Sequence, residues 1–198
     1  NVGISEIILE TALPWSPQQS DRLTQALKSV INIADDITVT FALDCNPPQT
    51  WLRENPDDAS TTSFRSSLYP SVGSKKWLDA TTSRIQSLIE PLKPQIEENR
   101  ITGFILQGLE NGQWVRTGAT DTSVAHHNAF REWVTNQYPD GEALREAWND
   151  ETIDSPDAPL LPLAKTSTDT SNVLALPKID QQIIDYNAFI NDATTSSI

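Results

Sequence analysis

Hydrophobic and polar positions follow two different periods along the chain. Three short runs rich in β-branched residues have the length and composition of strands, and they lie at 4–9, 37–43 and 101–107. In the run at 37–43, large apolar residues alternate with Thr and Ala, which indicates a strand covered on both faces. Elsewhere apolar residues recur every three or four positions, which predicts helices at about 21–34, 74–92, 122–138, 141–148 and 178–193. Ser20 and Ser74 are the expected N-caps of the first two helices.

The order of these elements predicts the fold class. Strands and helices alternate up to residue 107, and only helices follow. Such alternation implies right-handed crossovers and a parallel sheet, so we expect an α/β fold with extra helices. We expect 1–149 to form a βα-repeat domain, the Pro-, Asp-, Ser- and Thr-rich stretch 150–177 to be a loop or linker, and 178–198 to add a C-terminal helix to the same domain. The stretch between 44 and 74 shows no periodicity and is predicted to be a long loop.

Charge and composition exclude several classes of protein. The 27 acidic and 14 basic residues leave a net charge of −13 without a basic cluster, which argues against binding to nucleic acid or to an anionic membrane surface. The chain contains no run of ~20 apolar residues, which is the length that a membrane-spanning helix needs. The chain as given carries no signal peptide pattern, so the localisation stays undetermined. It starts at Asn1 and contains no methionine, which indicates a segment of a longer protein.

Metal and cofactor chemistry find little support in the sequence. The single cysteine, Cys45, excludes an internal disulfide and a multi-cysteine metal site, and it follows an apolar run, so we expect a partly buried thiol without a catalytic role. The adjacent His126 and His127 would point about 100° apart on a helix, which does not suit one metal ion. We expect one to point inward and one outward. Neither a Gly-x-Ser-x-Gly motif nor a phosphate-binding glycine pattern is present, so we expect no metal and no cofactor.

Polar and aromatic residues follow each predicted strand. In a parallel sheet all three strand ends point the same way, so these residues should gather at one edge. Carboxylates and amides bind sugar hydroxyls, and an indole binds the apolar face of a pyranose. The pattern is therefore typical of a carbohydrate-binding cleft, with Trp77, Trp133 and Trp148 instead on helix faces and expected to pack. The candidate site residues are Glu10, Trp15, Asp44, Asn46, Trp51, Glu110, Gln113 and Trp114.

Four segments, taken in order, resemble a known family. They are 44–56 (DCNPPQTWLRENP), 101–114 (ITGFILQGLENGQW), 127–148 (HNAFREWVTNQYPDGEALREAW) and 184–189 (IDYNAF). Together they resemble the second to fourth strands of glycoside-hydrolase (βα)8 barrels of the family 42 beta-galactosidase type and their uncharacterised relatives. The resemblance covers about residues 4–190. It implies part of a TIM-barrel-like fold and a beta-galactoside-type carbohydrate as the ligand.

Two departures from that family bear on activity. The family pattern implies a glutamate general acid/base where this chain has Gln113, and an amide cannot deliver a proton to a glycosidic oxygen. Glu110, three residues earlier, is an alternative acid. The strand expected to carry the nucleophilic carboxylate is absent, and the open sheet edges would need another chain, further sequence or self-association to cover them. Two hypotheses stay open: a glycoside hydrolase seen in part, and a non-catalytic carbohydrate-binding or assembly module derived from one.

Overall fold

The computed structural model describes residues 5–32, 37–61, 67–109, 112, 114, 121–155 and 177–195. The chain divides into two compact units, which are described separately. The first unit comprises Asn1–Pro48 and Leu78–Trp114, and the second comprises Gln49–Trp77 and Val115–Ile198. The division of the sequence at residues 149 and 177 stays a prediction, since most of the intervening stretch lies outside the described residues.

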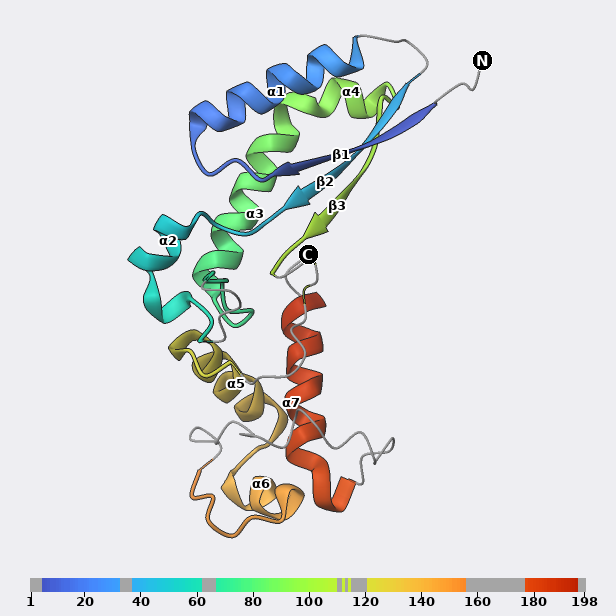
Figure 1. Cartoon of the computed structure of the whole chain (residues 1–198). Helices are drawn as coiled ribbons and strands as arrows, with labels where there is room; N and C mark the ends of the chain where they lie inside the picture. Colours follow the sequence, from blue (N-terminus) through green and yellow to red (C-terminus); the bar gives the residue numbers. More distant parts are fainter. Residues whose placement is uncertain are drawn as a thin grey trace. The chain divides into compact units, whose positions relative to one another are not determined.

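A parallel sheet forms the centre of the first unit. Its strands are β1 (Glu6–Ala12), β2 (Thr38–Asp44) and β3 (Ile101–Gln107), arranged in the order β1-β2-β3 (Figure 1). Both strand pairs are parallel. The predicted α/β class with parallel strands is thereby confirmed, and β3 has the predicted bounds. All three strands end at the same level, because Ala12, Asp44 and Gln107 are paired in register.

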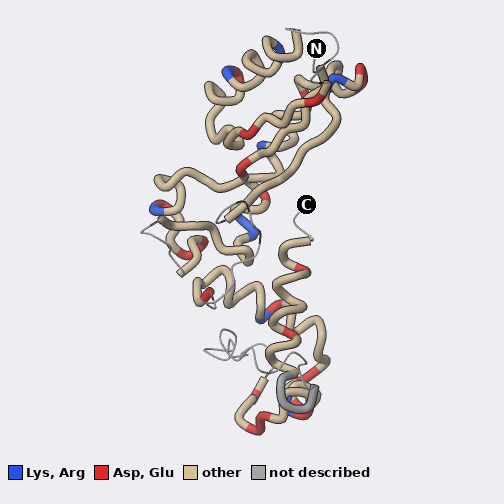
Figure 2. Tube along the Cα trace, turned by 45° about the vertical axis from the view of Figure 1, so that its right-hand side comes forward, with Lys and Arg blue, Asp and Glu red and all other residues tan. Residues whose placement is uncertain are grey.

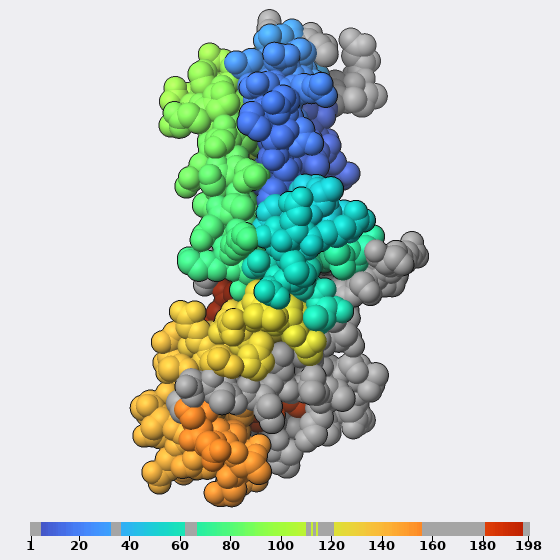
Figure 3. Space-filling view, turned by 90° about the vertical axis from the view of Figure 1, so that its left-hand side faces the viewer, coloured from blue at the N-terminus to red at the C-terminus, as the bar shows by residue number. Residues whose placement is uncertain are grey.

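Helices cover one face of this sheet. They are α1 (Pro17–Ile31) and α3 (Lys75–Ile89), with the short η2 (Glu90–Leu92) and α4 (Lys93–Glu97) after α3. Buried residues of α1, α3 and η2 pack against those of β2 in one core, formed by Leu27, Ile31, Val39, Phe41, Leu43, Leu88 and Leu92 among others. Figure 3, seen from the helical side, shows α1 in blue beside α3 in green.

The first helix begins earlier than its apolar pattern indicates. Ser16 is the N-cap, and its side chain and that of Gln19 form a reciprocal capping box. Ser20 therefore lies inside α1 and does not cap it. The prediction was wrong because residues 17–20 are all polar or proline and add nothing to the hydrophobic period. The predicted cap of α3 is confirmed, since the Ser74 hydroxyl accepts the Trp77 N–H at 3.0 Å.

The opposite face of the sheet remains open within the described part of the first unit. Ile8 is 60% exposed and Ile105 is 45% exposed, although both lie in strands. Glu10 pairs with Ala42, and Ala42 pairs with Ile105, so these three side chains lie on one face of the sheet. Ile8 lies on the same face, because it is two residues before Glu10 on β1. In a complete (βα)8 barrel, helices cover the outside of the sheet and the inward side chains pack together. The exposed face thus corresponds to the inside of such a barrel.

Helices build the second unit. They are α2 (Gln49–Glu54), the short η1 (Pro56–Asp58), α5 (Val124–Gln137), α6 (Gly141–Trp148) and α7 (Pro177–Thr195). The presence of α2 corrects the prediction of an uninterrupted loop between 44 and 74. At six residues it is too short to develop a recognisable period. Aromatic residues dominate the core of this unit, which includes Phe130, Val134, Leu144, Trp148, Tyr186 and Phe189.

A buried carboxylate joins three helices of the second unit. Asp185 of α7 is 6% exposed and accepts hydrogen bonds from Tyr138 Oη at 2.5 Å and Trp148 Nε1 at 2.7 Å. Gln181, one turn earlier on α7, donates to its other oxygen at 2.7 Å. The segments 127–148 and 184–189 therefore owe part of their residue pattern to packing. Trp77 and Trp148 are buried as predicted, and Trp133 is half-buried.

Three further observations concern the basic residues, the length and hydropathy of the helices, and the metal-ligating side chains. Lys and Arg are scattered along the trace and do not gather in one segment (Figure 2). Of the helices in the described ranges, none is long and apolar enough to cross a membrane. A search of the same residues finds no group of His, Cys, Asp and Glu arranged to hold a metal ion.

Candidate functional site

The candidate site lies at the carboxyl ends of the three strands. Main-chain pairing continues for one residue beyond them: the Leu13 N–H donates to the Asp44 carbonyl at 2.8 Å, and the Cys45 N–H donates to the Gln107 carbonyl at 2.7 Å. These bonds hold the starts of the three following loops at one level. The edge at which parallel α/β folds present ligands is thus well defined here.

Asp44 is the exposed carboxylate at this edge. It ends β2 and lies between Ala12 and Gln107 in the register of the sheet. One of its oxygens accepts the Asn46 N–H at 3.0 Å, which forms an Asx turn and orients the carboxylate. Its side chain is exposed, so the carboxylate is accessible to a ligand from solvent.

Asn46 joins two loops. Its Oδ1 accepts the Leu109 N–H at 2.9 Å, and its Nδ2 donates to the Leu109 carbonyl at 2.9 Å. This pair of bonds holds Leu109 in a left-handed conformation, with φ of 55° and its side chain buried. We assign Asn46 a positioning role, because its amide groups are engaged in holding the loop after β3 against the loop after β2.

Trp114 packs close to the end of β3. Its Nε1 donates to the Leu106 carbonyl at 2.8 Å, and its ring lies over Gly108. A Cβ at Gly108 would approach the indole to 3.1 Å, so the close packing of this ring depends on glycine. The side chain is half-buried and contributes to the core of the first unit.

Gln107 is a further candidate site residue and is not among those predicted from the sequence. It is the last residue of β3, it is half-buried, and its register partner is Asp44. Gly112, with φ of 74°, brings the following loop against the Gln107 side chain, to which a Cβ at Gly112 would lie 3.4 Å away. A strand-terminal polar residue was the available signal, but it was included with the apolar run of the strand.

Glu10 and Trp15 do not directly follow β1, because Glu10 lies within the strand and Trp15 lies beyond its end. Glu10 is exposed two residues before the strand end, on the open face of the sheet. Trp15 lies in the turn before α1, and the Arg84 guanidinium stacks on its ring at 4.3 Å from the centroid. This cation–π contact covers one face of the indole, so at most the other face remains for a sugar.

Three further residues of the predicted site, Trp51, Glu110 and Gln113, are not seen at this edge in the part of the chain that the structure describes. Trp51 lies on α2, in the second compact unit, and is half-buried. Glu110 and Gln113 fall outside the described residues. Of the predicted set, Asp44 and Asn46 lie at the end of β2 and Trp114 contacts the end of β3, and the register places Gln107 beside Asp44.

Cys45 takes no part in this chemistry. Its side chain is buried, and burial, with a smaller contribution from the charge of Asp44, raises the pKa of the thiol to about 12. A thiol with so high a pKa is not a nucleophile near neutral pH. The sequence predicts a partly buried thiol, and the structure buries it completely.

Comparison with known proteins relates the whole chain to one class of enzyme fold. No family model matches the sequence, and no curated protein matches it significantly. Among solved structures, the polyextremophilic beta-galactosidase from the Antarctic haloarchaeon Halorubrum lacusprofundi superposes with a TM-score of 0.67 at 14% sequence identity. The match covers 98% of this chain and 29% of the beta-galactosidase chain.

The fold is therefore glycoside-hydrolase-like, and it matches part of that longer chain. At 14% identity the likeness concerns the fold alone and assigns neither a family nor an activity. The chain spans less than a third of that beta-galactosidase, so any property of the whole enzyme is a matter for proposal.

Proposed function

We propose that this chain is a glycoside-hydrolase-like domain of the family 42 type that binds beta-galactoside-type carbohydrate, with turnover impaired by Gln113. The observation that supports it most is the set of Asp44, Gln107 and Trp114 at the carboxyl ends of the parallel strands β2 and β3. Barrel enzymes place their ligands at this edge. The overall likeness to a beta-galactosidase supports the choice of ligand class.

The chemistry of the three side chains suits a sugar. The Asp44 carboxylate accepts hydrogen bonds from hydroxyl groups, and the Gln107 amide both donates and accepts them. The half-buried Trp114 indole, which contacts Leu106 and Gly108 at the end of β3, would provide an apolar surface for the C–H face of a pyranose. An incomplete site of this kind would bind weakly, with a dissociation constant of about 1 mM, which corresponds to about −4 kcal/mol.

Turnover requires more than this site offers. Glycosidases use a pair of carboxyl groups, and loss of general acid catalysis alone costs roughly 10²–10⁴ in rate. By the family resemblance the acid position is Gln113, which lies outside the described residues. We therefore infer binding without efficient hydrolysis, with Glu110 as the alternative acid.

An assembly role is the second candidate, and the open face of the sheet favours it. Ile8 and Ile105 are exposed on that face, and β1 and β3 are edge strands of the described sheet. We propose that further parallel strands cover these edges, from another chain, from additional sequence or by self-association.

The test of binding is calorimetry with lactose and hydrolysis of a nitrophenyl β-galactoside. We expect saturable heat for the wild type, a large loss in Asp44→Asn, and no loss in the control Asp21→Asn, which removes an exposed carboxylate on α1. Gln113→Glu should raise a trace rate if a second carboxylate is available. Absence of heat in the wild type would overturn the proposed ligand class.

The test of assembly is sedimentation. If the open face is a contact surface, Ile8→Lys should weaken association, while Val124→Lys should not, because Val124 is an equally exposed apolar residue on α5 of the second unit. A wild-type chain that stays monomeric at all concentrations would contradict self-association and leave a different chain or further sequence as the cover.

A further inference from the structure

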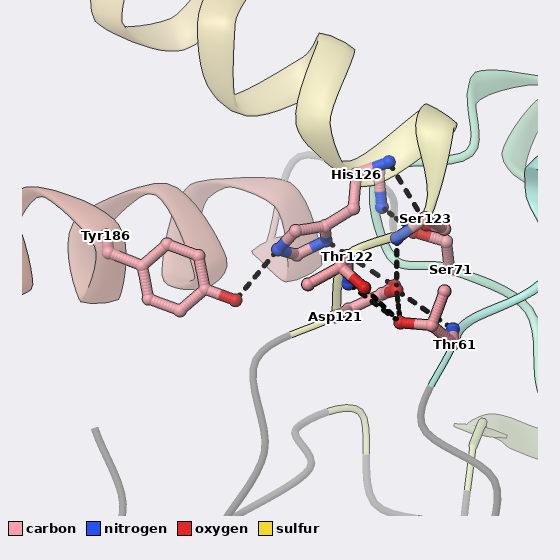
Figure 4. A network of polar contacts seen from close by, with 8 residues as sticks. Thr61, Ser71, Asp121, Thr122, Ser123, His126 and Tyr186 are labelled. Carbon is pink, nitrogen blue, oxygen red and sulfur yellow. Dashed lines mark hydrogen bonds and ion pairs between the residues drawn. The ribbon is translucent and has the colours of Figure 1, made fainter. Parts of the chain in front are cut away.

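A chain of three ionisable side chains links α7 to the start of α5, independently of the proposed sugar site. His126 of α5 is 1% exposed and lies between Tyr186 of α7 and Asp121 of the preceding segment (Figure 4). Its Nε2 is 2.8 Å from the Tyr186 hydroxyl, and its Nδ1 is 3.7 Å from Asp121 Oδ2. The imidazole also meets the rings of Tyr186 and Phe189 edge to face, at centroid distances of 5.6 and 5.2 Å.

The surroundings define which nitrogen carries the proton. If Nδ1 were unprotonated, its lone pair would face the Asp121 carboxylate, which is unfavourable. Nδ1–H is therefore the tautomer that we assign, and Nε2 accepts the Tyr186 hydroxyl proton. A second proton then has to bind at Nε2, which is the atom that accepts the hydrogen bond from α7.

Asp121 is positioned too far from the ring to neutralise a charged histidine fully. Its Oδ1 is occupied by Thr61 N–H at 3.1 Å, Thr61 Oγ1 at 3.3 Å and Ser123 N–H at 2.9 Å. These bonds fix the carboxylate, and its Oδ2 remains beyond hydrogen-bonding distance of Nδ1. Burial lowers the pKa of His126, the charge of Asp121 partly opposes this effect, and His127 adds to the lowering.

Other charged groups on the surrounding elements are directed elsewhere. On α7, Asp185 accepts from Tyr138 and Trp148. On η1, which packs against α5, Asp58 accepts from the Ser74 hydroxyl at 2.7 Å. In the turn that carries Gly73, a Cβ would lie 2.7 Å from the His126 Cα, so this side of the histidine is closed by backbone. Among the described residues, Asp121 and Tyr186 are thus the titratable groups next to the ring nitrogens, and His127 acts on the ring through its charge.

We propose that Asp121, His126 and Tyr186 form a pH switch that holds α7 against α5 at neutral pH and releases it when His126 is protonated. Protonation forces the Tyr186 hydroxyl to accept where it had donated, and it places a charge on a side chain that is 1% exposed and has its nearest carboxylate oxygen at 3.7 Å. Because the closed state binds the proton less readily than the open state, acid favours the open state. The closing contribution is complete above the ordinary histidine pKa of 6.5 and declines as the pH falls below it towards the lowered pKa in the closed state.

The test combines histidine titration with hydrogen exchange on the full chain. NMR should show His126 titrating below the ordinary histidine pKa of 6.5. In the same pH range, the protection factors of α7 amides should fall by up to about tenfold per pH unit, the limit for a single proton. The amides of α3 serve as an internal reference and should show no such fall.

Three variants separate the switch from general acid sensitivity. His126→Phe keeps an aromatic ring and should abolish the pH dependence of α7 protection, while the control His127→Phe should retain it. Asp121→Asn removes the charge that favours imidazolium and should move the transition to lower pH. The proposal is overturned if His126 titrates like a free histidine, if α7 protection stays constant while His126 titrates, or if His126→Phe leaves the pH dependence unchanged.

Discussion

The buried carboxylate of Asp185 allows the stability of the second unit to be tested quantitatively. In Asp185→Ala, the Trp148 indole N–H loses its partner in a buried position, and Tyr138 and Gln181 lose theirs in half-buried ones. A buried donor left unsatisfied costs about 1–3 kcal/mol, and hydrogen bonds to charged groups contribute about 1.5–3 kcal/mol. Since water can reach Tyr138 and Gln181, we expect a total loss of about 3 kcal/mol in the free energy of unfolding.

The matched control lies on the same helix. Asp192 of α7 accepts the Trp133 indole N–H at 2.8 Å, but this carboxylate is exposed, so Asp192→Ala should cost less than about 1 kcal/mol. Unfolding in urea is monitored through the hydrogen exchange of amides in α5 and α6, which both belong to this unit. Equal losses in the two variants, within about 0.5 kcal/mol, would refute the reasoning from burial.

The same variant has a second, spectroscopic readout. Burial raises the pKa of Tyr138, and its hydrogen bond to the Asp185 carboxylate raises it further. In Asp185→Ala the pKa of this phenol should therefore fall, although burial still keeps it above the ordinary value. An alkaline titration at the tyrosinate absorption band measures the shift, and a pKa that stays in place would show that Asp185 does not act on Tyr138.

Three further outcomes follow from single features of the structure. Cys45 should resist a thiol reagent at pH 8 in the native protein and react completely on unfolding; rapid native labelling would contradict its burial. Gly73→Ala should destabilise the second unit by about 1–3 kcal/mol, because its Cβ would meet the His126 backbone, whereas Gly103→Ala has open space on β3 and should cost less, as thermal unfolding of both variants will test. Raising the salt concentration from 0.1 to 1 M shortens the Debye length from about 10 to about 3 Å, so the thermal midpoint of this chain, with net charge −13, should rise; a fall would mean that charge repulsion is unimportant.

Sequence periodicity predicted β3 well because this strand is an apolar run between clear breaks, whereas β1, predicted at 4–9, spans Glu6–Ala12 and continues through the polar Glu10 and Thr11. The run 101–107 lies between polar residues and Gly108, and β3 has the same bounds. Periodicity failed at α1, where a capping box and a proline set the start without any apolar residue. It also missed α2, whose six residues span fewer than two turns.

The candidate site was predictable only in outline. Strand ends gather at one edge in any parallel sheet, so the location of Asp44 and Trp114 could be inferred from their place in the chain. The engagement of Asn46 by Leu109 and the covering of Trp15 by Arg84 depend on contacts between residues far apart in sequence. Likewise, the adjacent Asp and Tyr on α7 give no indication in the sequence that Asp185 and Tyr186 contact different partners, Trp148 and His126.

The most direct test of the proposed function is to map lactose binding by NMR on the ¹⁵N-labelled full chain. We expect concentration-dependent shifts at Asp44, at the Gln107 side-chain amide and at the Trp114 indole, with the strand starts unaffected. No shifts at these three residues up to about 100 mM lactose, two orders of magnitude above a dissociation constant of about 1 mM, would contradict a carbohydrate site at the strand ends.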